Sequence, residues 1–176
     1  MHITIIGAGA MGCLFGGILT ENGQRVSLLD VRQDHVAVLN KEGLRIVHQG
    51  TERIIKVQAT TNPAEIQHTE LALIFVKHAQ TETAGHTAAQ LLKDNGIALT
   101  LQNGMGNVGI LAQILGKNRV FCGTTAQGAM SLELGAIQHS GTGKTFIGAY
   151  QKKRLAIAKK IALIFSEAGI EAQEEK

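Results

Sequence analysis

Residues 2–30, with the sequence HITIIGAGAMGCLFGGILTENGQRVSLLD, decide the fold of this chain. The first of them, residues 2–6, are rich in isoleucine and predict a buried strand of a parallel sheet. A glycine-rich turn follows, and then a stretch typical of a helix that stops near Asn22-Gly23. A second apolar strand at 26–29 ends in an acid, Asp30. This order of elements is that of a dinucleotide-binding unit.

The glycines of the turn have the spacing G-x-G-x-x-G, and each one has a separate task. Gly7 permits a tight turn out of the strand, Gly9 lets the backbone approach a pyrophosphate, and Gly12 lets the helix pack close to the sheet. The pyrophosphate is expected at the helix N-terminus, which favours an anion. The alternative is a strand-turn-helix unit in which the glycines are incidental, and the order of the surrounding elements argues against it. The predicted cofactor-binding loop is Gly7, Ala8, Gly9, Ala10, Met11 and Gly12.

Beyond Asp30, strands and helices alternate, which predicts a doubly wound, Rossmann-like α/β fold with a mostly parallel sheet and added antiparallel strands. Residues 1–176 are expected to form a single dinucleotide-binding domain. The expected helices cover 33–42, 79–93 (closed by Asn95-Gly96), 108–115 and 152–168, with a helical turn at Asn62-Pro63. The expected strands cover 44–47 and 53–57 (a hairpin), 71–76, 97–101, 120–125, 135–139 and 145–148 (two antiparallel strands), and 170–172.

The bulk composition is that of an ordinary globular protein, with 44% hydrophobic and 18% charged residues. The longest apolar runs, such as 71–76, are too short to span a bilayer, so no membrane partner is expected. Two cysteines cannot form a disulfide framework, and no secretion signal precedes the first strand. A cytoplasmic location follows as the expectation.

Two further classes of function are disfavoured. The net charge of +3 invites a nucleic-acid partner, but an aromatic content of 3% without tryptophan provides no base-stacking surface. The late basic residues, at 152–160, are typical of the solvated face of a helix. The seven histidines show no paired ligand spacing, so no metal site is predicted.

Polar residues follow several of the predicted strands, where a doubly wound sheet binds its ligands. They lie within a series of motifs: GAGAMG at 7–12, Val76-Lys77 with Gln80, QNGMG at 102–106, GTT at 123–125, and the later Gly135, His139, Gly141 and Ile147-Gly148. Together these motifs resemble the 2-dehydropantoate 2-reductase (ketopantoate reductase) family. The run Asn-Gly-Met-Gly after a strand is close to diagnostic, and the resemblance covers the whole chain in order.

This resemblance implies an NAD(P)-dependent oxidoreductase that reduces the C2 keto group of 2-dehydropantoate to (R)-pantoate, a step toward pantothenate and coenzyme A. It implies that Lys77 and Asn103 act in catalysis and contact the cofactor, and that Ala129 adds a cofactor contact. The residues agree in kind, because Lys77 and Asn103 are polar groups after hydrophobic strands, where a ketone oxygen or carboxylate could be held. The alternatives are that Lys77 is an ordinary surface lysine and that Asn103 is a helix N-cap.

The choice between NAD and NADP rests on the residues after the second strand. The resemblance implies NADP, held by an arginine, but that position falls on Val31. Asp30 precedes it and would repel a 2′-phosphate while accepting hydrogen bonds from ribose hydroxyls, which favours NAD. Arg32 follows it and could still serve NADP. Asp30 and Arg32 are therefore both predicted to bind cofactor, with a preference for NAD as the hypothesis.

The family's C-terminal helical domain, which carries the general-acid lysine, is expected to be absent from this chain. Residues 1–176 are then expected to bind cofactor and to turn over poorly. The expected partner is a small-molecule 2-keto acid, with a homodimer as a candidate assembly. A reductase of another 2-keto acid, a dinucleotide-sensing module without chemistry, and a different Rossmann dehydrogenase stay open as alternatives. The last of these shares the first motif but not residues 102–106.

Overall fold

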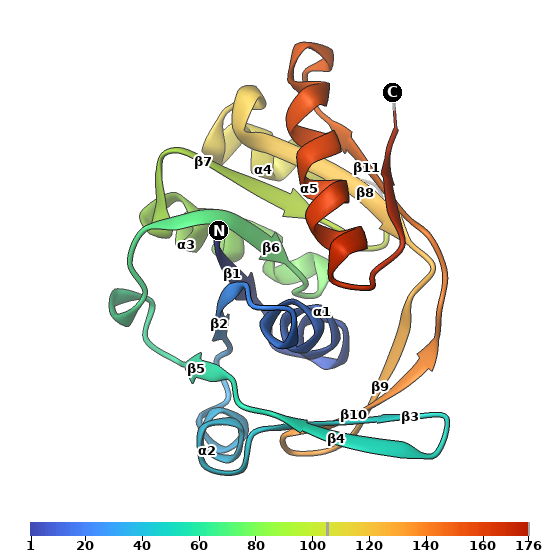
Figure 1. The fold of residues 1–176 in the computed structure, drawn as a ribbon. Helices are drawn as coiled ribbons and strands as arrows, with labels where there is room; N and C mark the ends of the chain where they lie inside the picture. The colour runs from blue at the N-terminus through green and yellow to red at the C-terminus, as the bar shows by residue number, and fades with distance from the viewer. Residues whose placement is uncertain (105, 176) are drawn as a thin grey trace.

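The computed structural model describes residues 1–104 and 106–175, and it shows two sheets with a helix between them (Figure 1). Within these residues, an eight-stranded sheet has the order β12-β11-β8-β7-β6-β1-β2-β5. Its pairs are parallel except for β11, which is antiparallel to β8. The predicted mostly parallel sheet with added antiparallel strands is thereby confirmed. The strands are β1 (His2–Ile6), β2 (Arg25–Leu29), β5 (Gln58–Thr60), β6 (Thr69–Ile74), β7 (Leu92–Thr100), β8 (Val120–Thr125), β11 (Thr145–Ala149) and β12 (Ala172–Glu174).

The second sheet has the order β4-β3-β10-β9. The predicted hairpin is present as β3 (Leu44–His48) and β4 (Thr51–Ile55), and β10 (Ala136–Gly141) lies parallel to β3. Strand β9 (Gly128–Glu133) was not predicted, because most of its side chains are exposed and show no alternation. The strands predicted at 135–139 and 145–148 exist, but they join different sheets: β10 pairs with β9, and β11 pairs with β8.

Helices cover both faces of the larger sheet. The helices α3 (Thr81–Leu91) and α4 (Asn107–Leu115) pack in one core with β6 and β7. The helices α1 (Ala10–Glu21) and α5 (Leu155–Glu167) pack in the other, which also contains the inner residues of the second sheet. Figure 1 shows α1 between the two sheets and α2 (Gln33–Glu42) at their lower edge. Short 3₁₀ turns complete the chain: η1 (Pro63–Glu65), η2 (His78–Gln80), η3 (Lys117–Arg119) and η4 (Lys152–Arg154).

The prediction that Asn95-Gly96 closes the helix over 79–93 is wrong. Helix α3 ends at Leu91, and Gly96 lies inside β7. A register shift lets Leu92 pair with Thr69 and Ile97 pair with Leu71. A Cβ added to Gly96 would lie 2.9 Å from the carbonyl oxygen of Thr69. The glycine therefore permits close approach of two strands. In the sequence, such a glycine cannot be told from one that ends a helix.

The terminal strand starts later than predicted, at Ala172 and not at residue 170. Gly169 has φ +91°, and the chain turns back so that the N–H of Ile170 donates to the carbonyl oxygen of Phe165 at 2.9 Å. The Ile170 side chain is fully buried in the core beside α5. Its apolar character therefore reflects the helix end and not a strand.

Two glycines set the distance between α1 and the larger sheet. A Cβ added to Gly12 would overlap the carbonyl oxygen of Gly7, and one added to Gly16 would lie 2.5 Å from Cδ2 of Leu28. The overlap at Gly12 is with backbone and requires backbone movement, whereas the one at Gly16 requires the Leu28 side chain to shift, so Gly12 is the stricter requirement for a glycine. The packing role predicted for Gly12 is confirmed.

Candidate functional site

The candidate site lies where the strand order of the larger sheet reverses. The chain runs from β1 to β2 on one side and then crosses to β6 on the other side of β1. The register aligns Ile6 with Leu29 and with Ile74, and Ile74 with Thr100. The loops that follow these four strands therefore start at one edge of the sheet, the place where doubly wound folds bind their ligands.

The glycine-rich loop occupies the centre of this edge. Gly7 has φ +96°, and its N–H donates to the carbonyl oxygen of Leu29 at 2.9 Å. Gly9 is the N-cap of α1, and a Cβ added there would meet no atom within 4 Å. Because the first N–H groups of a helix have no intrahelical acceptor, this open N-terminus is suited to bind an anion.

Asp30 lies directly after β2, and its side chain contacts Arg32. The Asp30 Oδ1 atom accepts from the backbone N–H of Arg32 at 3.0 Å and lies 3.3 Å from its Nε atom. The side chain of Asp30 is 10% exposed and that of Arg32 is 48% exposed. Val31 between them is 83% exposed. The carboxylate, and not the guanidinium, is therefore the more enclosed charge at the end of β2.

A side-chain amide ties the loop after β6 to the loop after β7. The Nε2 atom of Gln102 donates to the carbonyl oxygen of Val76 at 2.5 Å and to Oγ1 of Thr81 at 3.0 Å. Its Oε1 atom accepts from the Thr100 hydroxyl at 2.9 Å. Gln102 thus fixes the two loops that carry the predicted residues Lys77 and Asn103.

A second amide, Asn107, completes this network from the first turn of α4. It is 1% exposed, and its Oδ1 atom accepts from Thr81 Oγ1 at 2.9 Å and lies 2.7 Å from Nδ1 of His78. Its Nδ2 atom donates to the carbonyl oxygens of Asn103 at 3.2 Å and Gly104 at 3.4 Å. All four hydrogen bonds of a buried amide are thereby made, which favours a single arrangement of the loops.

The side chains of Lys77 and Asn103 are exposed at the edge of this network. Lys77 is the N-cap residue of η2, and Asn103 follows the strand that ends at Thr100. The alternative that Asn103 caps α4 is wrong, because Gly106 holds that position. Two polar side chains are therefore presented on neighbouring loops, at the same edge of the sheet as the N-terminus of α1.

The family model described as ketopantoate reductase PanE/ApbA matches residues 3–152. This chain belongs to that family. The 2-dehydropantoate 2-reductase of Halobacterium salinarum is 34% identical over 97% of the chain and 56% of the relative. That of Pyrococcus abyssi is 37% identical over 97% of the chain and 55% of the relative. The chain thus spans little more than half the length of the curated relatives it matches.

Solved structures of the same fold cover the chain completely. A D-mandelate dehydrogenase with NADH and anilino(oxo)acetate has a TM-score of 0.93 and 29% identity, and 57% of that chain is covered. A PanE/ApbA family ketopantoate reductase from Ralstonia eutropha has a TM-score of 0.88 and 30% identity, again over 57% of that chain. Residues 1–176 therefore have a fold that a D-mandelate dehydrogenase and a ketopantoate reductase share.

Ala129, predicted to contact the cofactor in this family, lies in β9 opposite His139. It is half-buried and packs against the core that contains α1. Cys13 is buried inside α1, where burial raises the pKa of its thiol to about 12. Cys122 in β8 is half-buried, and burial raises the pKa of its thiol. Neither thiol is suited to act as a nucleophile at neutral pH.

Two absences hold for the part of the chain that the structure describes. Among residues 1–104 and 106–175, no group of three or more His, Cys, Asp or Glu side chains could hold a metal ion. None of the helices in these residues combines the length and the apolar character that a membrane span requires.

The sequence did not single out the residues that hold this site together. Gln102 was noted within its motif, but the contacts of Thr81 and Asn107 were not foreseen. His35 was counted only among histidines without ligand spacing, yet it contacts the glycine-rich loop at Ala8, 27 residues away in the chain. Such contacts arise from the arrangement of elements in space, so no local pattern carries them.

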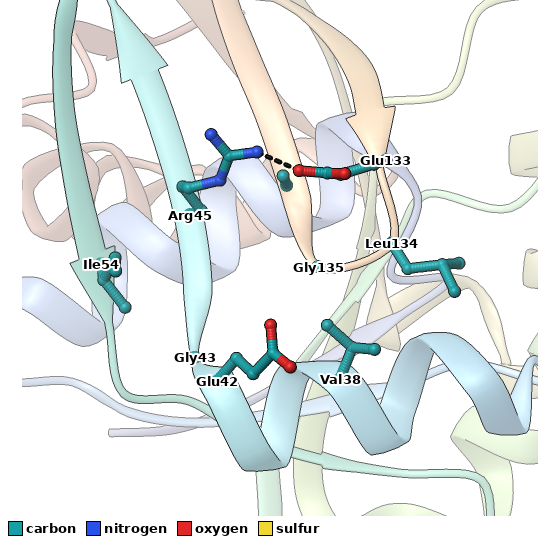
Figure 2. A pocket seen from close by; sticks show the side chains of 9 residues that line it. Val38, Glu42, Gly43, Arg45, Ile54, Glu133, Leu134 and Gly135 are labelled. Atoms are coloured by element: carbon teal, nitrogen blue, oxygen red, sulfur yellow. Dashed lines mark hydrogen bonds and ion pairs between the residues drawn. The ribbon is translucent and has the colours of Figure 1, made fainter.

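A hollow of about 360 Å³ lies away from this edge, between the end of α2 and the second sheet (Figure 2). Arg45 extends across it, forming ion pairs with Glu133 and Glu52. With two carboxylates beside it, the guanidinium is already neutralised and does not mark an anion site. The hollow shares no residue with the glycine-rich loop.

Proposed function

We propose that this chain is the cofactor-binding part of an NAD(P)H-dependent reductase that converts 2-dehydropantoate to (R)-pantoate, a step toward pantothenate and coenzyme A. The substrate is a small-molecule 2-keto acid. Family membership supports the proposal, and one structural observation carries it. The glycine-rich loop, Asp30, Lys77 and Asn103 all follow strands whose ends are in register at the switch point of the sheet.

Different residues of the site bind different parts of the dinucleotide. The backbone of 7–12 binds the pyrophosphate, and Asp30 accepts hydrogen bonds from ribose hydroxyls. The bound nicotinamide supplies the hydride. Lys77 and Asn103 lie at the nicotinamide end, where their N–H donors hold the keto oxygen as negative charge develops on it or hold the substrate carboxylate. Ala129 adds an apolar contact to the cofactor.

We further propose that the protein prefers NADH to NADPH. The enclosed carboxylate of Asp30 would repel a 2′-phosphate, and the Arg32 guanidinium that could attract one is paired with that carboxylate. The structure of D-mandelate dehydrogenase, which is 29% identical to this chain, contains NADH. A preference for NADPH of about tenfold or more, which is about 1.4 kcal/mol, would contradict this part of the proposal.

The test begins with cofactor binding by the full chain. Titration with NADH and NADPH, followed by fluorescence of the reduced nicotinamide, should give saturable binding of at least one of them. Lys77→Met and Asn103→Ala should weaken binding at the nicotinamide end while leaving the fold intact. Oxidation of the cofactor on adding 2-dehydropantoate then tests the reaction. Failure to bind either dinucleotide would contradict the proposed function.

A second candidate substrate comes from the structural comparison. The D-mandelate dehydrogenase structure matches this chain with a TM-score of 0.93. A reductase of an aryl-substituted 2-keto acid is therefore the second proposal. Comparing kcat/KM for 2-dehydropantoate and phenylglyoxylate, the keto acid related to mandelate, separates the two. The substrate with the higher kcat/KM identifies the reaction.

A further inference from the structure

His35 connects three parts of the protein that are distant in sequence. It lies on α2 and is 4% exposed. Its Nε2 atom lies 3.0 Å from the carbonyl oxygen of Ala8 in the glycine-rich loop and 3.7 Å from Sγ of Cys13 on α1. Its Nδ1 atom accepts a hydrogen bond from the N–H of Gly135, at the turn between β9 and β10, at 3.2 Å. The imidazole therefore bridges the loop, the helix behind it and the second sheet.

These contacts are compatible with only one form of the ring. A backbone N–H can only donate, so Nδ1 must be unprotonated where it faces Gly135. The proton of the neutral ring is then on Nε2, which donates to the carbonyl oxygen of Ala8. The thiol of Cys13 donates to the same oxygen at 3.1 Å. The neutral Nε2–H tautomer of His35 satisfies both of its backbone partners.

The surroundings of the ring favour this neutral form. Burial lowers the pKa of His35, and the nearby guanidinium of Arg32 lowers it further. The hydrogen bond to Ala8 and the carboxylates of Asp30 and Asp34 oppose this shift without cancelling it. From α1 the ring faces the thiol of Cys13, and from the turn between β9 and β10 it faces the Gly135 N–H.

The orientation of the Ala8 carbonyl determines that of the next N–H group. In a planar trans peptide, the C=O of one residue and the N–H of the following residue point in opposite directions. Ala8 is fully buried, and its carbonyl points inward to His35 and Cys13. The N–H of Gly9 must then point outward, and an added Cβ at Gly9 would meet no protein atom within 4 Å.

We propose that neutral His35 is a positioning residue for the cofactor, which holds the Ala8 carbonyl inward so that the Gly9 N–H is directed at the pyrophosphate. This inference rests on the proposed function. Protonation of Nδ1 would place two donors face to face at Gly135, so the ring would have to leave that contact and would loosen its hold on Ala8. Cofactor binding therefore weakens as the pH falls into the range where His35 takes up a proton.

The test measures the dissociation constant of NADH for the full chain between about pH 5 and pH 8. For the wild type we expect the constant to rise toward the acid end, where His35 takes up a proton. His35→Gln retains a donor for Ala8 and an acceptor for Gly135 without titrating. It should bind within about threefold of wild type at pH 8, which is at the lower end of the value of one hydrogen bond, and show a flatter profile. His35→Leu removes both contacts and should weaken binding about tenfold throughout, equivalent to about 1.4 kcal/mol.

A matched control and a second readout make the outcome decisive. His86→Gln is the same substitution at an exposed position of α3 and should keep the wild-type profile. The ¹⁵N shifts of the His35 ring should show the Nε2–H tautomer at pH 8. An Nδ1–H tautomer would overturn this inference and leave the proposed function standing. The same holds if NADH binding by His35→Gln weakens at acid pH as much as binding by the wild type. Absence of NADH and NADPH binding by the wild type at pH 8 would overturn the proposed function as well.

Discussion

The Nδ1 atom of His78 lies 2.7 Å from the amide oxygen of Asn107, and this contact joins the loop after β6 to the start of α4. Because an amide oxygen can only accept, the hydrogen of this bond is on Nδ1. Lys77 precedes this histidine, and the carbonyl oxygen of Asn103 accepts from the same amide. The separation of the two proposed catalytic residues is therefore set by an asparagine that is itself buried.

Replacement of this asparagine should affect both stability and binding. Asn107→Ala leaves the buried Thr81 hydroxyl without its acceptor and the half-buried Asn103 carbonyl without this donor. We expect the free energy of unfolding to fall by about 1–3 kcal/mol, the cost of unsatisfied buried polar groups. Urea denaturation measures this loss, and NADH titration should show weaker binding. Asn118→Ala, at an exposed position of η3, is the control. Wild-type stability and affinity in Asn107→Ala would show that the loops hold their positions without it.

Two glycine-to-alanine substitutions should have opposite effects. In Gly12→Ala the new methyl group overlaps the carbonyl oxygen of Gly7, so α1 must move away from the sheet. Stability should fall by about 3 kcal/mol or more, at the upper end of what overpacking costs. In Gly109→Ala, inside α4, the methyl group meets no atom within 4 Å, and stability should rise by about 0.5–1 kcal/mol. Thermal or urea unfolding compares the two variants. Equal effects would refute the packing argument.

Local sequence signals were sufficient for most elements of the fold. The helix at 33–42 and the strand at 120–125 agree residue for residue with the structure. The positions of Gly7, Asp30, Lys77 and Asn103 after successive strands were predicted from the alternation of strands and helices along the chain. Each of these predictions depends on residues that are close together in the chain.

The remaining features depend on partners far apart in the chain. Strands β10 and β11 are close in sequence but belong to different sheets, because β10 adds to β3 and β11 adds to β8. Likewise, the contact of His35 with Gly135 spans 100 residues. Such pairings are selected by packing of the whole core, so a reading of local periodicity cannot supply them.

Cofactor selection should respond to Asp30. Asp30→Ser removes the carboxylate that would accept from ribose hydroxyls and releases the Arg32 guanidinium from its ion pair. We expect NADH binding to weaken about tenfold, within the range for a hydrogen bond to a charged group, and NADPH binding to strengthen. Titration with both cofactors measures the ratio of the two dissociation constants. Arg32→Ala is the companion variant, and it should weaken NADPH binding while sparing NADH. An unchanged ratio in Asp30→Ser would remove Asp30 as the selector.

The stability of the folded chain should depend on pH through three enclosed histidines. Burial is the main cause that lowers the pKa of His2, His35 and His139. The unfolded chain binds protons at these side chains near pH 6.5, whereas the folded chain binds them only at lower pH. The unfolded state therefore holds more protons in this range, and the free energy of unfolding increases with pH. The stabilisation is fully present above about pH 6.5 and is lost as the pH falls through the lowered folded values.

Urea denaturation at about pH 7.5 and pH 5 tests this dependence, because Asp and Glu side chains with ordinary pKa values near 4 remain ionised over most of that interval. The wild type should be less stable at the lower pH. His35→Gln removes one of the three titrations, so its loss of stability between the two pH values should be smaller. His86→Gln replaces an exposed histidine and should lose as much as the wild type. If His35→Gln also loses as much as the wild type, His35 does not stay neutral in the folded protein, and its bridge between Ala8 and Gly135 is not maintained as described.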